Sequence, residues 1–152
     1  MKSLLIDTNI LLLLIVGTAS EAYIGKHKRT GEFSRRSFGQ LKSIVVQFPK
    51  VEAPPHVLAE VSSLLKNTND QGMLRELREK LKLFIEADSE LLVASLNGAR
   101  SNIYRWTGLT DSVLFELSKS KDRTLVTMDA DLFNEASSFR DGHINFRHLM
   151  AL

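Results

Sequence analysis

The chain has 152 residues, of which 43% are apolar and 25% are charged, and its formal net charge is +2. This length suits one hydrophobic core, so we expect a single domain spanning residues 1–152. The sequence contains no cysteine, which excludes disulfide bonds, thiolate zinc sites and cysteine nucleophiles. Its four histidines are scattered, and none belongs to an HExxH metal-binding motif.

The first segment indicates a buried strand followed by a buried helix. Ser3–Ile6 is short and apolar, which is typical of a central parallel strand. Thr8 or Asn9 can cap the helix that then runs through residues 10–16. These seven apolar residues are too few to cross a bilayer, and Asp7 would be costly inside a signal peptide. We therefore expect a soluble, cytoplasmic protein without membrane contact.

Residues 18–37 form a polar stretch after Gly17, a residue that favours helix ends. Within it, residues 26–36 carry five basic side chains against one acidic side chain, a local charge of +4. A basic segment beside an acidic site suits a polyanionic substrate, whereas the simpler alternative is a solvated charged surface. The candidate RNA-binding residues are Lys26, Lys28, Arg29, Arg35 and Arg36.

The rest of the chain alternates short apolar runs with amphipathic stretches. Strands are expected at 51–53, 90–93, 123–127 and 143–146, and helices at 34–48, 56–66, 73–85, 94–104, 111–120 and 130–136. Such alternation predicts an α/β fold with a mainly parallel sheet, in which sites form at the carboxyl ends of the strands. The apolar faces of 38–48 and 73–85 exceed the needs of a small domain, so we expect a homodimer.

Four carboxylates stand where a strand or turn meets a helix, and they are Asp7, Glu60, Asp111 and Asp129. Three of them have a simple structural alternative, namely capping a helix or lying in its first turn. Glu60 instead lies within an expected apolar helix face, where a glutamate is usually paired or functional because burying it alone is costly. A parallel sheet could bring all four together, and such a cluster is costly unless a cation neutralises it. An all-oxygen site suits Mg²⁺ or Mn²⁺. Metal-assisted hydrolysis of a phosphodiester is the reaction that such a site suggests first.

The segments that carry these carboxylates resemble, in order, the successive motifs of PIN-domain ribonucleases. The segments are LLIDTNILL at 4–12, PHVLAEV at 55–61, GLTDS at 108–112 and LVTMDADL at 125–132. The resemblance implies a three-layer α/β/α sandwich with a mainly parallel sheet, a divalent metal ion and hydrolysis of RNA. VapC-type toxins are the best-known small members of this family, so the resemblance also implies an antitoxin protein as a partner.

The resemblance assigns the acidic quartet, which is catalytic and binds the metal ion, to Asp7, Glu60, Asp111 and Asp129. It assigns the polar residues that orient these acids or a water molecule to Thr8, Asn9 and Thr127. Asp131 is a further carboxylate that either joins the outer shell of the metal or caps the next helix, and we favour capping. The chain departs from many small toxins in the long basic stretch 18–37, which marks a subgroup with its own substrate or partner contact.

Two other functional classes fit parts of the pattern. A non-catalytic PIN-like module would bind RNA or a protein with the same fold. A haloacid-dehalogenase or receiver-like domain also places an aspartate after the first strand, but the dehalogenase pattern needs a second aspartate where this chain has Asn9.

Trp106 could stack on a base, although we expect it to be a partly buried packing residue.

Overall fold

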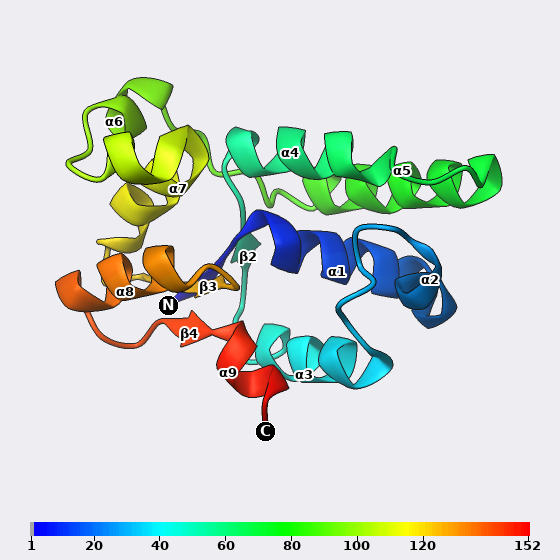
Figure 1. Cartoon of the computed structure of the whole chain (residues 1–152). Helices are drawn as coiled ribbons and strands as arrows, with labels where there is room; N and C mark the ends of the chain where they lie inside the picture. The colour runs from blue at the N-terminus through cyan, green and yellow to red at the C-terminus, as the bar shows by residue number, and fades with distance from the viewer. Residues whose placement is uncertain (1) are drawn as a thin grey trace.

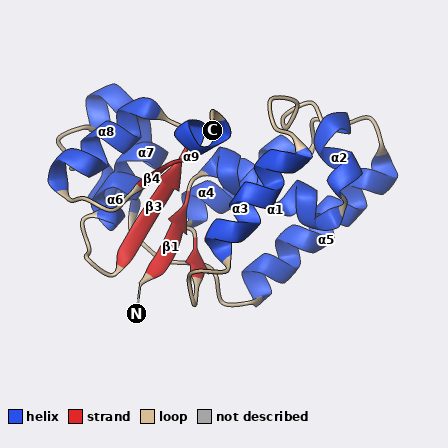
Figure 2. Cartoon of the chain, turned by 90° about the horizontal axis from the view of Figure 1, so that it is seen from below, coloured by secondary structure: helices blue, strands red, loops and turns tan. Residues whose placement is uncertain are grey.

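The computed structural model describes residues 2–152, and it contains a four-stranded, all-parallel sheet in the order β2-β1-β3-β4 (Figure 2). The strands are β1 (Ser3–Ile6), β2 (Val51–Glu52), β3 (Arg123–Thr127) and β4 (Ile144–Asn145). Helices flank this sheet, with α4 to α7 above it and α3 and α9 below it in the view of Figure 1. The predicted α/β fold with a parallel sheet is confirmed, and the arrangement is that of a three-layer α/β/α sandwich.

The helices of the described residues vary from single turns to more than four turns. They are α1 (Thr8–Ala19), α2 (Glu21–Lys26), α3 (Arg35–Val45), α4 (Pro55–Leu65), α5 (Gln71–Glu86), α6 (Ser95–Ala99), α7 (Tyr104–Ser118), α8 (Ala130–Phe139) and α9 (Phe146–Met150). None of the helices in residues 2–152 combines the length and the apolar character that crossing a membrane requires.

The two central strands set the geometry of the site. β1 is buried along its whole length, which explains its unbroken apolar sequence. In the parallel register Ile6 pairs with Val126, and the Asp7 amide donates to the Val126 carbonyl at 3.2 Å. Asp7 and Thr127 consequently leave the sheet side by side at the carboxyl ends of their strands.

Helix α1 extends past the expected stop at Gly17 and ends at Ala19. Gly17 is needed for packing and not for termination, because a Cβ atom built there would lie 2.4 Å from Cδ1 of Phe38 on α3. The expectation that Gly17 ends the helix was therefore wrong. The glycine instead allows α1 and the ring of Phe38 to approach closely.

The short elements near the C-terminus differ most from the expected ones. Residues 90–93 form no strand, and only Glu90 makes an isolated bridge, to Ala53. The expected strand 143–146 is cut short because α9 begins at Phe146, with the Asn145 side chain accepting from the Arg147 amide at 3.1 Å. Phe146 is fully buried and meets Phe33 edge to face, which anchors α9 to the segment before α3.

The apolar faces of α3 and α5 are largely used within the chain. Phe38, Leu41 and Ile44 of α3 are buried in the core. So are the α5 side chains Met73, Leu74, Leu77 and Leu81. The argument for a surplus of apolar surface on these two helices is therefore weaker than the sequence suggested, and the homodimer stays a prediction.

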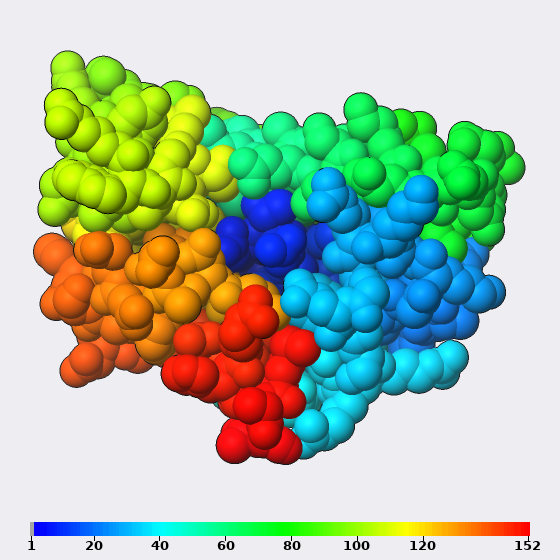
Figure 3. Space-filling model, in the orientation of Figure 1, coloured from blue at the N-terminus to red at the C-terminus, as the bar shows by residue number. Residues whose placement is uncertain are grey.

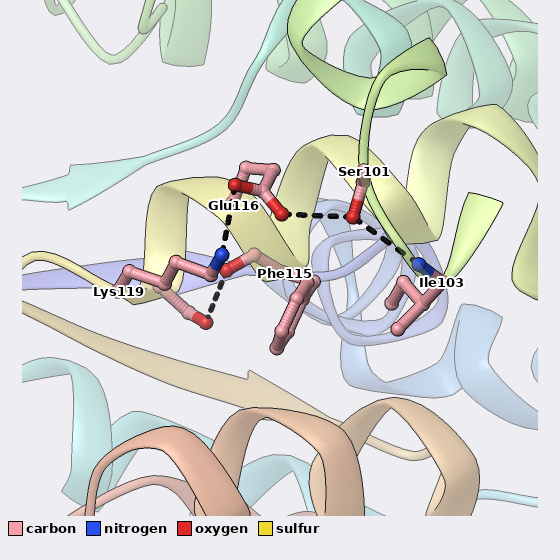
Figure 4. Close-up of polar contacts among 6 residues, drawn as sticks. Ser101, Ile103, Phe115, Glu116 and Lys119 are labelled. Carbon is pink, nitrogen blue, oxygen red and sulfur yellow. Dashed lines mark hydrogen bonds and ion pairs between the residues drawn. The ribbon is translucent and has the colours of Figure 1, made fainter.

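The connection from α6 to α7 is held by polar contacts (Figure 4). The Ser101 hydroxyl donates to Glu116 Oε2 at 2.8 Å, and Lys119 Nζ lies 3.0 Å from Glu116 Oε1. These contacts tie the turn before α7 to the second half of that helix. Gly98 of α6, which precedes the turn in the sequence, lets α6 pack closely on α7, since a Cβ atom at Gly98 would lie 2.6 Å from Cγ2 of Val113.

Candidate functional site

A hollow lies at the centre of the face shown in Figure 3. Its floor is dark blue, the colour of the start of the chain, where β1 passes into α1. Its rim is formed by α4, α7, α8, α9 and the segment between α2 and α3. These elements are far apart in the sequence, and they bring the four predicted carboxylates towards one region.

Asp7 is the most enclosed of the four carboxylates, with only 8% of its surface exposed. Its Oδ1 accepts from the Thr8 amide at 2.7 Å, and its Oδ2 accepts from the Thr127 hydroxyl at 2.5 Å. Asp7 is thus the N-cap of α1, and the expectation that Thr8 or Asn9 is the cap was wrong. The contact with Thr127 agrees with the predicted orienting role of that residue.

Asp129 is held next to Asp7 by the same hydroxyl group. The Asp129 amide donates to Thr127 Oγ1 at 3.0 Å, and Asp129 Oδ1 accepts from the Leu132 amide at 2.9 Å. Asp129 therefore caps α8, whereas Asp131 was expected to do so. Asp131 lies exposed in the first turn of that helix, where a negative charge is favoured by the helix dipole.

Glu60 lies on the exposed side of α4, although its sequence context suggested an apolar face. It nevertheless faces the site, because Oε1 accepts from the Thr8 hydroxyl at 2.8 Å and Oε2 accepts from the Thr110 hydroxyl at 2.6 Å. Glu60 thereby connects α1, α4 and α7. Each donor is the sequence neighbour of another candidate carboxylate, Asp7 in one case and Asp111 in the other.

Thr110 is a site residue that the sequence did not single out. It stands directly before Asp111, where a threonine is typical of a helix cap. Its hydroxyl contact with Glu60 depends on how α4 and α7 pack, which no local pattern reveals. Asn9 is exposed in the first turn of α1, beside the basic segment and not among the carboxylate contacts.

The electrostatics show that the four carboxylates influence one another. The pKa of Asp111 is raised to about 7, first by burial and then by the negative charges of Asp7, Asp129 and Glu60. Burial also raises the pKa of Asp7; hydrogen bonds from Thr127 and Thr8 oppose this, and Asp129 and Glu60 add to it. None of the ion pairs among residues 2–152 involves any of the four. The cluster therefore carries negative charge that no Lys or Arg side chain pairs.

The carboxylate oxygens of the cluster suit a hard divalent cation, although they are not yet arranged around a single point where the ion would bind. Within the described part of the chain, no three His, Asp or Glu side chains are positioned to hold one metal ion as they stand. All the candidate ligands are carboxylate oxygens, and an oxygen that accepts one hydrogen bond keeps a further lone pair. Asp7, Asp111, Asp129 and Glu60 are the residues that could hold the ion.

The basic segment reaches the site through only part of its length. Lys28 and Arg29 line a cavity of about 510 Å³ together with Asn9, Gly31, Glu32 and Leu64. The buried ring of His27 fixes this part of the segment, because its Nδ1 accepts from the Arg29 amide and its Nε2 donates to the Leu65 carbonyl. No local pattern predicts this role of His27, because its contact with the Leu65 carbonyl of α4 joins segments that are far apart in the sequence.

The other three candidate RNA-binding residues lie elsewhere. Lys26 and Arg35 line a separate cavity between α2 and α3. Arg36 donates to the carbonyl of Leu152 at 2.5 Å. The five basic residues therefore do not form one patch, and Lys28 and Arg29 are the two that accompany the acidic site.

Comparison with protein-family models, with curated proteins and with solved structures found no match. The chemistry of the site itself is what supports a function.

Proposed function

We propose that the chain is a metal-dependent ribonuclease that hydrolyses RNA phosphodiester bonds. The observation that carries the proposal is the unpaired acidic cluster, in which burial and then mutual repulsion raise the pKa of Asp7 and bring that of Asp111 to about 7. Keeping such charges together is costly without a counter-ion. A cluster of this kind is expected where a cation takes part in the chemistry.

Mg²⁺ or Mn²⁺ is the cofactor that fits carboxylate ligands, and Asp7, Glu60, Asp111 and Asp129 would hold it. When bound, the ion would orient the scissile phosphate, activate a water molecule and stabilise the leaving oxygen. The protein supplies the positions of the ligands. Thr127 orients Asp7, and two further hydroxyls, from Thr8 and Thr110, orient Glu60.

RNA would be bound by the neighbouring cationic surface. Lys28 and Arg29 line one cavity with Asn9, which follows Asp7 by two residues, and from there they would contact phosphates of the strand that enters the site. The cationic and acidic parts then have different tasks. The first attracts the polyanion, and the second places the cation against one phosphate.

The alternative is a non-catalytic PIN-like module that binds RNA or a protein. It is favoured by one observation, namely that no three acidic or histidine side chains of the described residues are arranged to hold a metal ion as they stand.

As a toxin, the ribonuclease would need an antitoxin that covers the hollow, and a cytoplasmic location and a homodimer would accompany that role. These remain parts of the proposal.

The proposal is tested by incubating purified protein with a mixed RNA pool in Mg²⁺, Mn²⁺ or EDTA. We expect cleavage with either metal ion, none in EDTA, and loss of cleavage in Asp7→Asn and Asp111→Asn. Asp141→Asn is the matched control, because Asp141 is exposed and lies outside the acidic cluster. Metal-independent cutting, or full activity of either cluster variant, would refute the proposal. RNA binding without cleavage would favour the alternative.

A further inference from the structure

Trp106 is the only tryptophan of the chain, and 79% of its surface is exposed. This contradicts the expectation that it packs against the core. A single exposed apolar side chain is common on protein surfaces, so the exposure of Trp106 is informative only together with the cavity that it lines. The ring lines a cavity of about 400 Å³ between α7 and α8, together with Ile103, Thr107, Asp131, Asn134 and Glu135.

The backbone around Trp106 is fixed in place. Thr107 Oγ1 donates to the Ile103 carbonyl at 3.0 Å, and it lies 3.0 Å from the hydroxyl of Ser112 on the far side of the Gly108 kink. The buried side chain of Ile103 anchors the same turn, which the Ser101–Glu116 contact of Figure 4 also holds. The indole is therefore presented by an ordered turn and not by a mobile loop.

The cavity and the acidic cluster are formed in part by the same two helices, α7 and α8. Trp106 comes shortly before Asp111 on α7, and Asp131 comes two residues after Asp129 on α8. In Figure 3 the yellow-green atoms of α7 rest on the orange atoms of α8 next to the central hollow. A strand whose phosphate occupies the hollow would thus carry a neighbouring base towards the indole.

The lining of the cavity suits a neutral ring with several N–H donors. It holds two carboxylates, Asp131 and Glu135, and one amide, Asn134, while none of its six residues is basic. Phosphate would be repelled there, whereas carboxylates accept hydrogen bonds from base edges. Guanine offers an adjacent ring N–H and amino group, which a single carboxylate can accept together. Uracil offers one N–H flanked by two acceptors, which these carboxylates would repel.

We propose that this cavity binds a base of the RNA strand next to the cleaved bond, with Trp106 stacking on the base and Glu135 or Asp131 selecting guanine. The inference rests on the proposed ribonuclease function for the identity of the strand. It goes further by naming the residues that determine the base preference.

The fluorescence of the only tryptophan reports on the cavity without any need for catalysis. Wild-type protein is titrated with guanosine and with uridine, which carry no phosphate. We expect guanosine to quench Trp106 at about tenfold lower concentration than uridine, a preference that the Asp131→Asn, Glu135→Gln double variant removes. Absence of quenching, or equal quenching by both nucleosides in the wild type, would overturn the inference.

Cleavage supplies a second, independent readout. Sequencing the products of a random RNA pool should show guanine enriched at one fixed position beside the cut. Trp106→Ala should lower kcat/KM about tenfold through lost stacking, and Trp106→Phe should retain most of it. Leu92→Ala is the control, because Leu92 is equally exposed at 79% but does not line the cavity.

The two readouts separate this inference from the proposed function. If the wild type does not cut RNA but guanosine quenches Trp106 selectively, the base site stands and the ribonuclease proposal fails. If the wild type cuts RNA without guanine preference and Trp106→Ala cuts equally fast, the ribonuclease stands and the base site is refuted.

Discussion

Asp111 is the residue at which the cost of the acidic cluster can be measured. Its pKa of about 7 lies well above the ordinary value of 3.8, mainly because of burial and then because of three neighbouring carboxylates. The folded protein therefore binds a proton here that the unfolded chain has already released at neutral pH. In the metal-free protein this difference makes the free energy of unfolding depend on pH.

The first prediction concerns Asp111→Asn in EDTA. The stability that the tightly bound proton contributes is fully present below pH 3.8 and is lost as the pH rises through about 7. An asparagine at position 111 is uncharged throughout this pH range, so the variant does not lose stability there in this way. We expect the variant to gain about 1–2 kcal/mol relative to the wild type between about pH 4 and pH 8, a magnitude reduced to allow for partial solvent exposure.

Urea unfolding of both proteins at the two pH values measures this gain. Asp141→Asn serves as the exposed control and should show no such pH-dependent difference. A constant stability difference between Asp111→Asn and the wild type at both pH values would refute the electrostatic coupling.

The second prediction concerns Thr127, whose buried hydroxyl donates to Asp7 and accepts from the Asp129 amide. Thr127→Val keeps the shape but leaves the buried Asp7 carboxylate and the part-buried Asp129 amide without that hydrogen bond. We expect a loss of about 1–3 kcal/mol in urea unfolding, together with weaker Mn²⁺ binding. Thr124→Val is a control in the same strand, because Thr124 is also buried and does not contact the cluster. Equal Mn²⁺ affinity in Thr127→Val and the wild type would contradict the orienting role.

At the scale of elements, the kink at Gly108 decides where the two halves of α7 point. Gly108 has φ +82° and ψ −176°, a conformation that is essentially restricted to glycine. Before the kink α7 carries Trp106, and after it the helix carries Thr110 and Asp111. The glycine thereby lets one helix serve both the cavity and the acidic cluster.

The third prediction compares two glycine substitutions with opposite signs. Gly108→Ala should destabilise the protein by about 1–3 kcal/mol because alanine disfavours this conformation. Gly39→Ala lies within α3 with no atom near the added methyl group, so it should stabilise the protein by about 0.5–1 kcal/mol. Thermal unfolding measures both changes. A neutral Gly108→Ala would show that the kink is not maintained by the glycine.

Elements with a strong local signal could be predicted from the sequence, and elements defined by contacts could not. β1 and β3 were expected with their observed bounds, β1 because it is a short apolar run and β3 because its residues are mostly β-branched or apolar. Helix α9 was missed because one turn has no periodicity, and its position depends on Phe146 meeting Phe33. Capping by Asp7 and Asp129 was considered only as the alternative to a role in the site, and neighbouring residues were preferred as the caps. Several residues at each boundary can cap a helix equally well, so the sequence does not decide among them.

The candidate site shows the same division. The four carboxylates were recognised from their places at strand and helix junctions, and the structure brings them into mutual electrostatic range. Thr110 and His27 were missed because their roles arise from contacts with α4 that join distant segments. The basic residues were treated as one group, whereas the fold separates Lys28 and Arg29 from Arg36.

At the scale of the whole molecule, charge is divided between the two ends of the sheet. The carboxyl end holds the acidic cluster, and the segment between α2 and α3, which carries Lys28 and Arg29, forms part of the rim of the hollow. Lys121 lies in the turn before β3, at the amino end of the sheet. A polyanion that reaches the cluster would therefore contact Lys28 and Arg29 and would not contact Lys121.

The fourth prediction follows from this division. Lys28→Ala and Arg29→Ala should each weaken the binding of single-stranded RNA and reduce the slope of log affinity against log salt concentration by about 0.7. Lys121→Ala should leave both quantities unchanged. Fluorescence anisotropy of a labelled oligonucleotide at several salt concentrations measures them. Equal effects of the three substitutions would place the RNA elsewhere on the molecule.

The central claim is that the carboxylates at the carboxyl end of the sheet bind a divalent cation. Titration with Mn²⁺, followed by electron paramagnetic resonance of the free ion, tests this most directly. We predict that the wild type and Asp141→Asn bind Mn²⁺ with the same affinity and that Asp111→Asn loses most of it. Failure of the wild type to bind Mn²⁺, or unchanged binding by Asp111→Asn, would contradict the claim.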